Sequence, residues 1–451
     1  MSTSSAPFSR RRSIKSGVWA TIQQFVTLGS TAITGIILAR TVSVSDLGVF
    51  SFATNLASIG TAILTAGLAG IAIKAFVDKP ASAHRTMTAL ILIREFFAIL
   101  AYLVLLPISA LVGDAAVVGA TAIALLVLFA RALDASELWF QAQARSGSTA
   151  PVRIAVVLVM LGIRLVLAFA GADLMTFVIL YVVEAVVVSS LLLVRYARDR
   201  DSPKFAKPEI ETPRALLGSS WILMLASLAT QINSRGDVVV IQALLGSSAV
   251  GLYSAAARLS EMAYFLPVVF MTATFPRLLQ VRREYGQKSR QYKQELQASY
   301  DRAFWAGVLI AVVILLIGPW VLTTLYGAKY EASGPVLQIH VLALPFVFMA
   351  AVFSKFIIAE NALFASLTRN TLGAVLNIAL NFLLIPHWGI LGSAWATVFS
   401  YFVASYLSCF ATKTTRVAGV QMTLAFIYPL RLLASAVRGT RKKGSHEEEA
   451  P

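Results

Sequence analysis

Charged side chains interrupt several stretches of this sequence that are apolar and long enough to span a bilayer. Insertion scales put the cost of a charge at the membrane midplane at ~2.5–3.5 kcal/mol or more, so such a residue usually faces a wet cavity or a partner helix. Arginine binds phosphate through paired hydrogen bonds and keeps its charge at physiological pH. The basic residues therefore predict a cationic cavity that holds a pyrophosphate. They are Arg94, Arg131, Arg164, Arg235, Arg258 and Lys355.

Uncharged polar residues extend this prediction. Gln231, Asn233 and Gln242 lie on the stretch that carries Arg235, and their amides suit the hydroxyl groups of sugars. In the alternative interpretation, the basic residues form ion pairs between helices, or reach the membrane interface from span ends with their long side chains. The two interpretations differ in whether the guanidinium groups have carboxylate partners.

Spacing indicates which acidic residues can pair with a basic residue of the same helix. Arg131 and Asp134 are three residues apart, and so are Arg258 and Glu261. Residues at this spacing are neighbours on a helix surface, so each pair is predicted to meet.

Two other acids lack such a neighbour. Glu184 has no basic residue within a turn, and Asp237 is two residues from Arg235, on a different helix face. A midplane carboxyl without a partner can take up and release an ion. Glu184 and Asp237 are therefore the predicted ion-coupling sites, and a static salt bridge is the alternative for each.

Two prolines, Pro267 and Pro345, also fall within apolar stretches. Proline removes a backbone hydrogen bond and clashes with the preceding turn, so each predicts a kink. These kinks are candidate hinges for alternating access, and a static kink is the alternative.

The elements that must position these residues are membrane helices. The chain is 58% hydrophobic and 13% charged, whereas a soluble domain has about 25% charged residues. The sequence predicts an all-α polytopic membrane protein with about twelve transmembrane helices. The predicted spans are 17–39, 48–73, 87–112, 115–140, 152–170, 174–194, 217–244, 249–276, 303–325, 334–359, 367–385 and 389–411.

The loops between these spans differ in charge. With a cytoplasmic N-terminus, 30 of the 38 Lys and Arg lie in cytoplasmic segments, six in spans, and two, Arg40 and Lys329, in outer loops. This bias predicts that both termini are cytoplasmic. It also accounts for most of the net charge of +16 without nucleic acid as a partner, and leaves membrane lipids as the partner of the basic surface.

An internal repeat divides the chain into two six-helix lobes. Trp19 precedes Gly48-Val49-Phe50-Ser51 much as Trp221 precedes Gly251-Leu252-Tyr253-Ser254. An even number of helices per lobe predicts a parallel pseudo-repeat, with a substrate site between the lobes. The predicted order is a cytoplasmic tail (1–16), the first lobe (17–195), a cytoplasmic linker (196–214), the second lobe (215–412) and a cytoplasmic tail (413–451). In the last tail, Met422–Val437 is predicted to lie at the interface and the acidic end to be disordered.

Other kinds of chemistry have little support. The chain has no Gly-x-x-x-x-Gly-Lys-Ser/Thr sequence for ATP, and a single cysteine, Cys409. The four histidines are scattered, so no metal and no cofactor is predicted. The outer loops are a few residues long, too short for a water-facing catalytic loop, and we expect that the protein is not an enzyme.

Three segments resemble the Wzx-type polysaccharide flippases, which belong to the same superfamily as the multidrug and toxin extruders. Ala39-Arg40 with Asp46-Leu47-Gly48-Val49-Phe50 resembles that family's first outer turn, although Val42-Ser43 replaces the usual Leu-Gly. Asp237 with Val250-Gly251-Leu252-Tyr253-Ser254-Ala255-Ala256 and Leu266-Pro267 is similar to its seventh and eighth helices. Asn381-Phe382-Leu383-Leu384-Ile385-Pro386, followed by Gly389-Ile390-Leu391-Gly392-Ser393-Ala394, resembles its last hairpin. The likeness covers roughly residues 15–412.

This resemblance implies a flippase of the bacterial plasma membrane. It would move a polyprenyl-pyrophosphate-linked oligosaccharide from the inner to the outer leaflet for surface polysaccharide synthesis, in exchange for H⁺ or Na⁺. A polysaccharide polymerase is a further candidate partner. The alternatives are a flippase for lipid II, the peptidoglycan precursor, a cation-coupled multidrug exporter, and a membrane glycosyltransferase or ligase. Because drug exporters carry mainly cations, their cavities should be acidic rather than basic.

Overall fold

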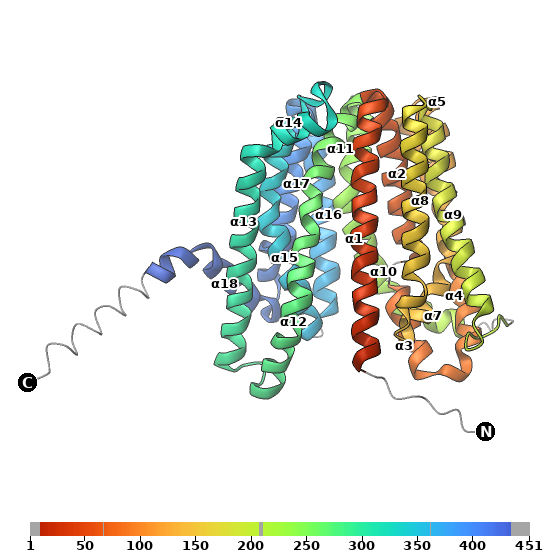
Figure 1. The fold of residues 1–451 in the computed structure, drawn as a ribbon. Helices are drawn as coiled ribbons and strands as arrows, with labels where there is room; N and C mark the ends of the chain where they lie inside the picture. The colour runs from red at the N-terminus through yellow and green to blue at the C-terminus, as the bar shows by residue number, and fades with distance from the viewer. Residues whose placement is uncertain (1–9, 66, 207–210, 361, 434–451) are drawn as a thin grey trace, which may run out of the picture.

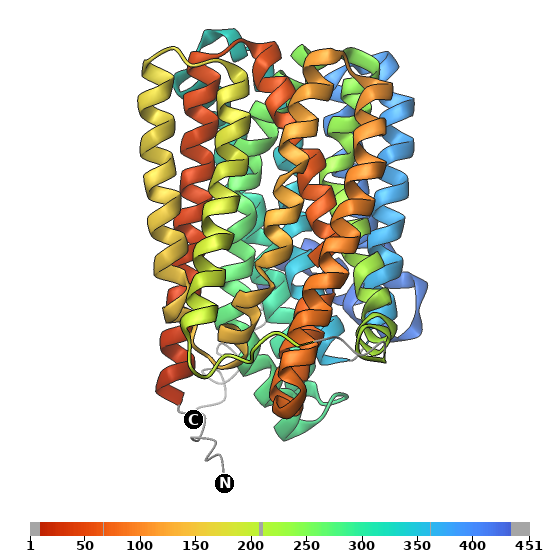
Figure 2. The ribbon, with the colours of Figure 1, turned by 90° about the vertical axis from the view of Figure 1, so that its right-hand side faces the viewer.

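The computed structural model describes residues 10–433 apart from residues 66, 207–210 and 361, and every regular element among them is helical. The long helices run side by side between a lower face, where α1 begins, and an upper face, where α1 ends (Figures 1 and 2). Eleven segments of the described chain are long and apolar enough to cross a membrane. The remaining predicted span corresponds to the 35-residue α10 (Glu211–Leu245). The prediction of an all-α polytopic fold is thus confirmed.

The first six spans form the right-hand group in Figure 1. Two of them are interrupted. The second bends at Gly67, whose φ of 72° favours glycine, and the fourth consists of three short helices. The helices are α1 (Arg10–Thr41), α2 (Val44–Thr65), α3 (Leu68–Asp78), α4 (Ala83–Val112), α5 (Ala115–Leu125), α6 (Val127–Leu133), α7 (Ala135–Ala142), α8 (Ala150–Phe169) and α9 (Leu174–Arg198).

The second six spans repeat this alternation of direction, beginning with α10. After them the described chain continues in a shorter helix, which packs against α13, and in the helical residues 428–433. The helices that follow α10 are α11 (Ser247–Glu261), α12 (Phe265–Tyr285), α13 (Arg290–Tyr326), α14 (Ser333–His340), α15 (Leu344–Ala359), α16 (Leu363–Trp388), α17 (Ile390–Ser405) and α18 (Lys413–Phe426).

The ends of the lobes differ in part from the predicted segments. α1 already begins at Arg10, and α10 begins at Glu211, within the predicted linker. The last helix, α18, starts before the predicted interfacial segment Met422–Val437. The predicted acidic end and residues 1–9 of the N-terminal tail lie outside the described residues, and the division into domains stays a prediction.

Both predicted hinge prolines lie directly after a break in their span. Pro267 follows a 3₁₀ turn at Met262–Tyr264, and Pro345 follows one at Val341–Ala343. Each turn contains the residue four positions before the proline. The carbonyl of that residue receives no helical hydrogen bond from the proline, because proline has no backbone N–H. The breaks are therefore a local consequence of the prolines, and their role as hinges stays a prediction.

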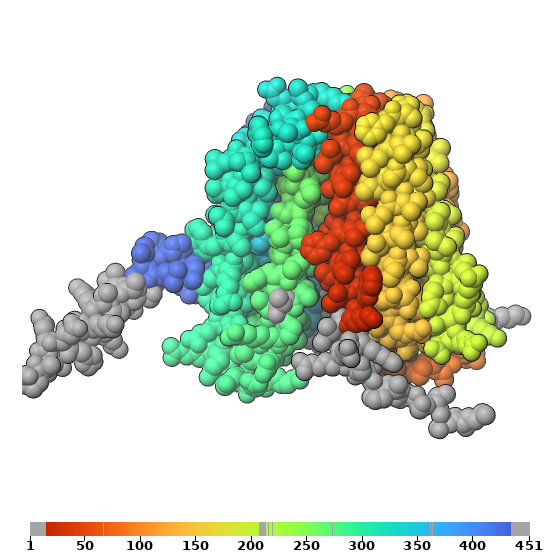
Figure 3. Space-filling view, in the orientation of Figure 1, coloured from red at the N-terminus to blue at the C-terminus, as the bar shows by residue number. Residues whose placement is uncertain are grey.

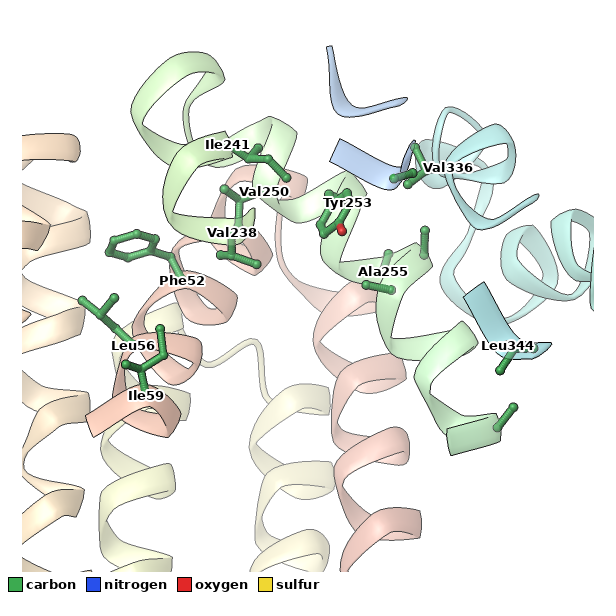
Figure 4. Close-up of a cluster of buried hydrophobic side chains, with 14 of the residues drawn as sticks. Phe52, Leu56, Ile59, Val238, Ile241, Val250, Tyr253, Ala255, Val336 and Leu344 are labelled. Atoms are coloured by element: carbon green, nitrogen blue, oxygen red, sulfur yellow. The ribbon is translucent and has the colours of Figure 1, made fainter. Parts of the chain in front are cut away.

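The two lobes meet mainly through α2, which packs against both α10 and α11. Figure 4 shows this contact as a cluster of apolar side chains, with Phe52 and Leu56 from α2, Val238 and Ile241 from α10, and Val250 from α11. All five are buried. Burying such side chains stabilises the contact by about 1.5–3 kcal/mol each.

Two repeat-related glycines allow a close approach between the lobes. A Cβ on Gly48 would lie 1.8 Å from the Ser247 carbonyl oxygen, and a Cβ on Gly251 would lie 2.1 Å from that of Val44. Each glycine therefore faces the backbone at the start of the other lobe's second span. The internal repeat seen in the sequence brings its two copies together, and together they close the upper end.

Two cations reinforce this closed end. Arg40 at the end of α1 donates from Nε to the Leu325 carbonyl at 2.8 Å, and also from Nη2 to the Thr324 carbonyl. Lys329 of the second lobe donates to the Val42 carbonyl of the first lobe at 2.6 Å. The last carbonyls of a helix lack partners within it, so each lobe supplies a cation that caps a helix end of the other. We call Arg40, Lys329 and their carbonyl partners the upper latch.

Gly251→Ala is expected to open the upper end. The added methyl group would overlap the Val44 carbonyl, and overpacking of this kind costs about 1–3 kcal/mol in the closed state only. Spin labels on Ala116 and Ala328, exposed at the upper ends of the two lobes, should move apart. The distance distribution is measured by pulsed electron resonance after Cys409 has been replaced by serine.

The matched control is Gly236→Ala, also a glycine to alanine change in the second lobe. A Cβ there would meet only Ile232 Cγ2 at 3.5 Å and Ile378 Cγ1 at 3.7 Å, which are ordinary contacts. An unchanged distance distribution in Gly251→Ala, or an equal shift in Gly236→Ala, would contradict the role assigned to the close approach.

Candidate functional site

The interlobe site centres on Arg258 in α11. Its Nη2 donates to the Ser51 hydroxyl of α2 at 3.0 Å, and its guanidinium lies 5.9 Å from the centre of the Phe50 ring. A Cβ on Gly35 of α1 would lie 3.0 Å from its Nη1. Arg258 therefore lies where three helices from both lobes converge, and Gly35 leaves the space for its head group.

Arg258 is not paired with Glu261, so that part of the prediction is wrong. Glu261 instead receives both of its hydrogen bonds from Arg235 of α10, at 2.8 and 3.0 Å. Within the described chain, no carboxylate lies within ion-pair distance of Arg258. Spacing along α11 identified Glu261 as a possible partner of Arg258, but α10 brings the guanidinium of Arg235 to Glu261 instead. The charge of Arg235 is thus neutralised inside the second lobe, and the charge of Arg258 is not.

The Arg235–Glu261 pair should behave as a structural ion pair. Arg235→Ala and Glu261→Ala each leave one partly buried charge without its partner, and the cost should be less than that of breaking a fully buried pair, about 3–5 kcal/mol. The double variant removes both charges, so it should be more stable than the sum of the single effects predicts. The measurement is a double-mutant cycle on the thermal unfolding of the purified protein.

Arg277 and Glu295 provide a matched control pair. They lie 3.2 Å apart, and the Arg277 side chain is 73% exposed, so their coupling should be about 0–1 kcal/mol. Additive single effects for Arg235 and Glu261 would show that the pair has no structural role.

A second polar cluster surrounds Asp237, which is only 4% exposed. Tyr253 donates to Asp237 Oδ2, and the Tyr253 hydroxyl lies 3.2 Å from Thr397 Oγ1. The Val238 amide donates to the other carboxylate oxygen at 2.8 Å. No basic side chain forms an ion pair with Asp237 within the described residues, so the static salt bridge proposed as its alternative is not observed there.

Amides and hydroxyls on α16 and α17 extend this cluster. Asn377 and Asn381 are one turn apart on α16, and Ser393 and Thr397 are one turn apart on α17; all four are buried. Asn381 donates to the Asn377 carbonyl at 2.8 Å, and Asn377 donates to Ser400 at 3.4 Å. In the described part of the chain, Asn381 Oδ1 and the Ser393 hydroxyl have no hydrogen-bond partner. A buried carboxylate beside unpaired oxygens suits a small hard cation.

The sequence interpretation did not assign Asn377, Asn381, Ser393 or Thr397 to a site. The available signal was the spacing of four within each span, which places each pair on one helix face. Charge was used as the guide to function, and these residues are uncharged.

The first lobe holds a third cluster. Arg153 of α8 donates to Glu137 at 2.7 Å and to Asp134 at 3.2 Å, and Ser189 donates to Asp134 at 2.6 Å. The predicted pair of Arg131 with Asp134 is therefore wrong, because Arg153 reaches Asp134 from another helix. No hydrogen bond or ion pair of Arg131 is found in the part of the chain described.

Glu184 and Arg164 are partners. Arg164 Nη1 of α8 lies 2.8 Å from Glu184 Oε2 of α9, so the two side chains form an ion pair. The angles of this contact do not meet those of a hydrogen bond. The expectation that Glu184 lacks a basic partner is wrong, because its partner comes from the neighbouring helix. This result favours the static salt bridge for Glu184 and makes Arg164 a weaker phosphate ligand.

The remaining predicted residues do not join one site. Lys355 lies 5.4 Å from the centre of the Phe275 ring, Gln231 donates to the Ser58 carbonyl at 3.4 Å, and Gln242 accepts from Ser247 at 3.2 Å. Arg94 is buried in the first lobe, and Asn233 is buried beside Gly373. The structure thus distributes the predicted cavity residues over three regions. In one of them Arg258 contacts both lobes, and its guanidinium has no carboxylate partner within the described residues.

The surface is hollowed beside this region. The space-filling view shows a furrow between α1 and α12, below the closed upper end (Figure 3). Phe25 of α1 and Phe265 of α12 approach across it, with ring centres 5.2 Å apart. No group of three or more His, Cys, Asp or Glu side chains that could hold a metal occurs among the residues the structure covers.

Two family models match the chain over more than half of its length. One, described as polysaccharide biosynthesis protein, matches residues 13–282, and the other, described as lipid II flippase MurJ, matches residues 200–443. They overlap across the junction between the lobes.

Two curated proteins are similar in sequence. The probable low-salt glycan biosynthesis flippase Agl15 of Haloferax volcanii is 24% identical over 281 residues, which are 59% of this chain and 56% of that protein. An uncharacterized membrane protein of Methanocaldococcus jannaschii is 25% identical over 214 residues, which are 45% of this chain and 40% of that protein. The matched part spans about half the length of these relatives.

Solved structures share the fold. A lipid II flippase MurJ in an inward closed conformation has a TM-score of 0.73 at 14% identity, covering 93% of both chains. An inward-facing multidrug resistance MATE family transporter has a TM-score of 0.66 at 16% identity, covering 94% of this chain and 99% of that chain. A MOP superfamily transporter from Pyrococcus furiosus has a TM-score of 0.61 at 13% identity, covering 95% and 96%.

Proposed function

Because the chain belongs to the family of polysaccharide biosynthesis proteins and has the fold of MATE-like exporters, we propose that it is a flippase for a lipid-linked glycan. Its cargo is a polyprenyl-pyrophosphate-linked oligosaccharide, moved from the cytoplasmic to the outer leaflet. The observation that carries this proposal is Arg258, a guanidinium between the lobes with no carboxylate partner in the described chain. The protein acts as a carrier and not as an enzyme.

Arg258 is suited to a pyrophosphate. Arg258 is partly buried, so its charge is costly without a counter-charge, and a diphosphate that enters between the lobes supplies that counter-charge. A guanidinium binds phosphate oxygens with two parallel hydrogen bonds, so it recognises their geometry as well as their charge. Ser51 orients the group, since its hydroxyl accepts from one nitrogen and leaves others free.

Asp237 is our candidate for the coupling site. The carboxylate, the Tyr253 and Thr397 hydroxyls and the unpaired oxygens of the neighbouring α16 and α17 favour Na⁺, and a proton on the carboxylate is the alternative. The cluster lies inside the second lobe, whereas Arg258 lies between the lobes. An ion that alters the packing of α10 against α16 and α17 would therefore change the lobe that presents Arg258.

We propose that transport proceeds by alternating access, with the two lobes rocking around Arg258. In this arrangement the upper face lies outside the cell, both termini are cytoplasmic, and the membrane is the bacterial plasma membrane. The breaks before Pro267 and Pro345 supply the hinges. A reporter enzyme that is active only outside the cell should be active when it is fused after Ala328. The same enzyme should be inactive when it is fused after Tyr285.

The test of the function uses purified protein in lipid vesicles. A polyprenyl-pyrophosphate-linked oligosaccharide enclosed in the inner leaflet should become accessible to a glycosidase added outside, and vesicles without protein should not show this. Lipid II is tested in parallel, because a MurJ model matches residues 200–443. Movement of lipid II alone would assign the protein to peptidoglycan synthesis, and movement of neither lipid would refute the flippase.

A further inference from the structure

The first lobe encloses a polar cavity that the proposed transport does not use. Its volume is about 90 Å³, and it lies among α1, α6, α8 and α9. A water molecule takes roughly 30 Å³ in the liquid, so the cavity has room for a small ion and its remaining water. The polar side chains that line it are Thr27, Arg131, Asp134, Arg153, Tyr181 and Glu184.

The acids of this cavity have partners, and one base does not. Asp134 accepts hydrogen bonds from Arg153 and Ser189, and Glu184 lies against Arg164. Arg131, in contrast, has no hydrogen bond or ion pair in the described chain, and its Nε is buried without a partner. The group that lacks a counter-charge is therefore a cation.

The charges of the whole cluster lead to the same conclusion. Arg94 is 3% exposed and lies on α4, which packs against α6 and α7, the helices next to Asp134 and Glu137. With Arg131, Arg153 and Arg164 it makes four guanidiniums, against the three carboxylates of Asp134, Glu137 and Glu184. One positive charge remains unbalanced inside a lobe that lies in the membrane, where low polarity makes such an excess expensive.

We propose that this cavity binds one small monovalent anion, of the size of chloride, against the Arg131 guanidinium. The hydroxyl groups of Thr27 and Tyr181 line the same cavity and can donate to the anion. An anion there would link α1 to the helices α6, α8 and α9. The first lobe would then hold its shape as one body, and its stability would depend on the anion in solution.

The experiment measures equilibrium binding of radioactive chloride to the purified full chain in gluconate buffer of constant ionic strength. We expect saturable binding of one chloride per chain, and a rise in the thermal unfolding temperature over the same concentration range. Arg131→Gln should weaken binding at least tenfold and remove the chloride dependence of unfolding. Arg277→Gln, which changes an arginine whose side chain is 73% exposed, should leave both intact.

Two further variants complete the test. Arg258→Gln distinguishes the interlobe arginine from this cavity, and chloride binding should survive in it. If Arg131→Gln does not fold, Arg131→Lys takes its place in the test. This variant keeps the charge and should bind chloride more weakly than the natural chain. The proposal is overturned if the natural chain shows no saturable binding, which would mean that the cavity holds water only. It is also overturned if binding is lost in Arg258→Gln and kept in Arg131→Gln.

Discussion

Replacing Arg258 with alanine is expected to slow movement of the pyrophosphate-linked lipid strongly while the protein still inserts and folds. A hydrogen bond to a charged group contributes about 1.5–3 kcal/mol, so the loss of the guanidinium should lower the rate at limiting substrate roughly tenfold to a hundredfold. Arg258 donates one hydrogen bond to Ser51 and has no ion pair in the described chain. Its removal therefore leaves no buried carboxylate without a partner, and the thermal unfolding temperature should change little.

Two comparisons identify the cause of that loss. Arg258→Lys keeps the charge but cannot form two parallel hydrogen bonds, so its rate should lie between those of the alanine variant and the natural chain. Arg40→Ala removes an arginine at the upper latch and should leave substrate binding intact. Normal transport by Arg258→Ala in the vesicle assay would exclude the proposed phosphate contact.

Asp237→Asn is expected to uncouple transport from the ion gradient. The amide keeps the size of the side chain but removes the negative charge that a sodium ion needs and the group that a proton would titrate. Transport driven by an imposed Na⁺ or H⁺ gradient should fall at least tenfold, to the rate found without a gradient. The measurement compares gradients of each ion separately in the same vesicles.

Asp173→Asn is the matched control, since Asp173 caps the start of α9 in an exposed turn. It should keep the full response to the gradient. Asn381→Ala removes an unpaired oxygen on α16 without changing the charge, and it should weaken a response to Na⁺ more than one to H⁺. An undiminished gradient response in Asp237→Asn would place the coupling ion elsewhere.

The membrane fold was predictable because its signals are local. A run of about 20 apolar residues is enough to span a bilayer, and eleven such segments occur in the described chain. α10 was also predicted, although it carries several charged and polar residues. The repeat was visible as two similar helix starts, and the structure packs Gly48 and Gly251 against each other's segments.

The ion pairs were less predictable, because spacing identifies only neighbours on one helix. Glu261 lies one turn from Arg258, yet it pairs with Arg235 of another helix. Glu184 has no basic residue nearby in the sequence, yet Arg164 of the adjacent helix contacts it. Which helices are neighbours depends on packing, and this information is absent from a single sequence.

The chemistry of the upper latch has a consequence for how the protein responds to its surroundings. Arg40 and Lys329 bind backbone carbonyls, which do not titrate, whereas a carboxylate in their place could be protonated. Arginine also keeps its proton at all physiological pH values. Acidification of the medium on that side therefore cannot release the latch by protonating its acceptors. The stability that the latch gives to the closed state should therefore be the same in acidic and neutral surroundings, and any effect of acid on opening must arise elsewhere, within the lobes.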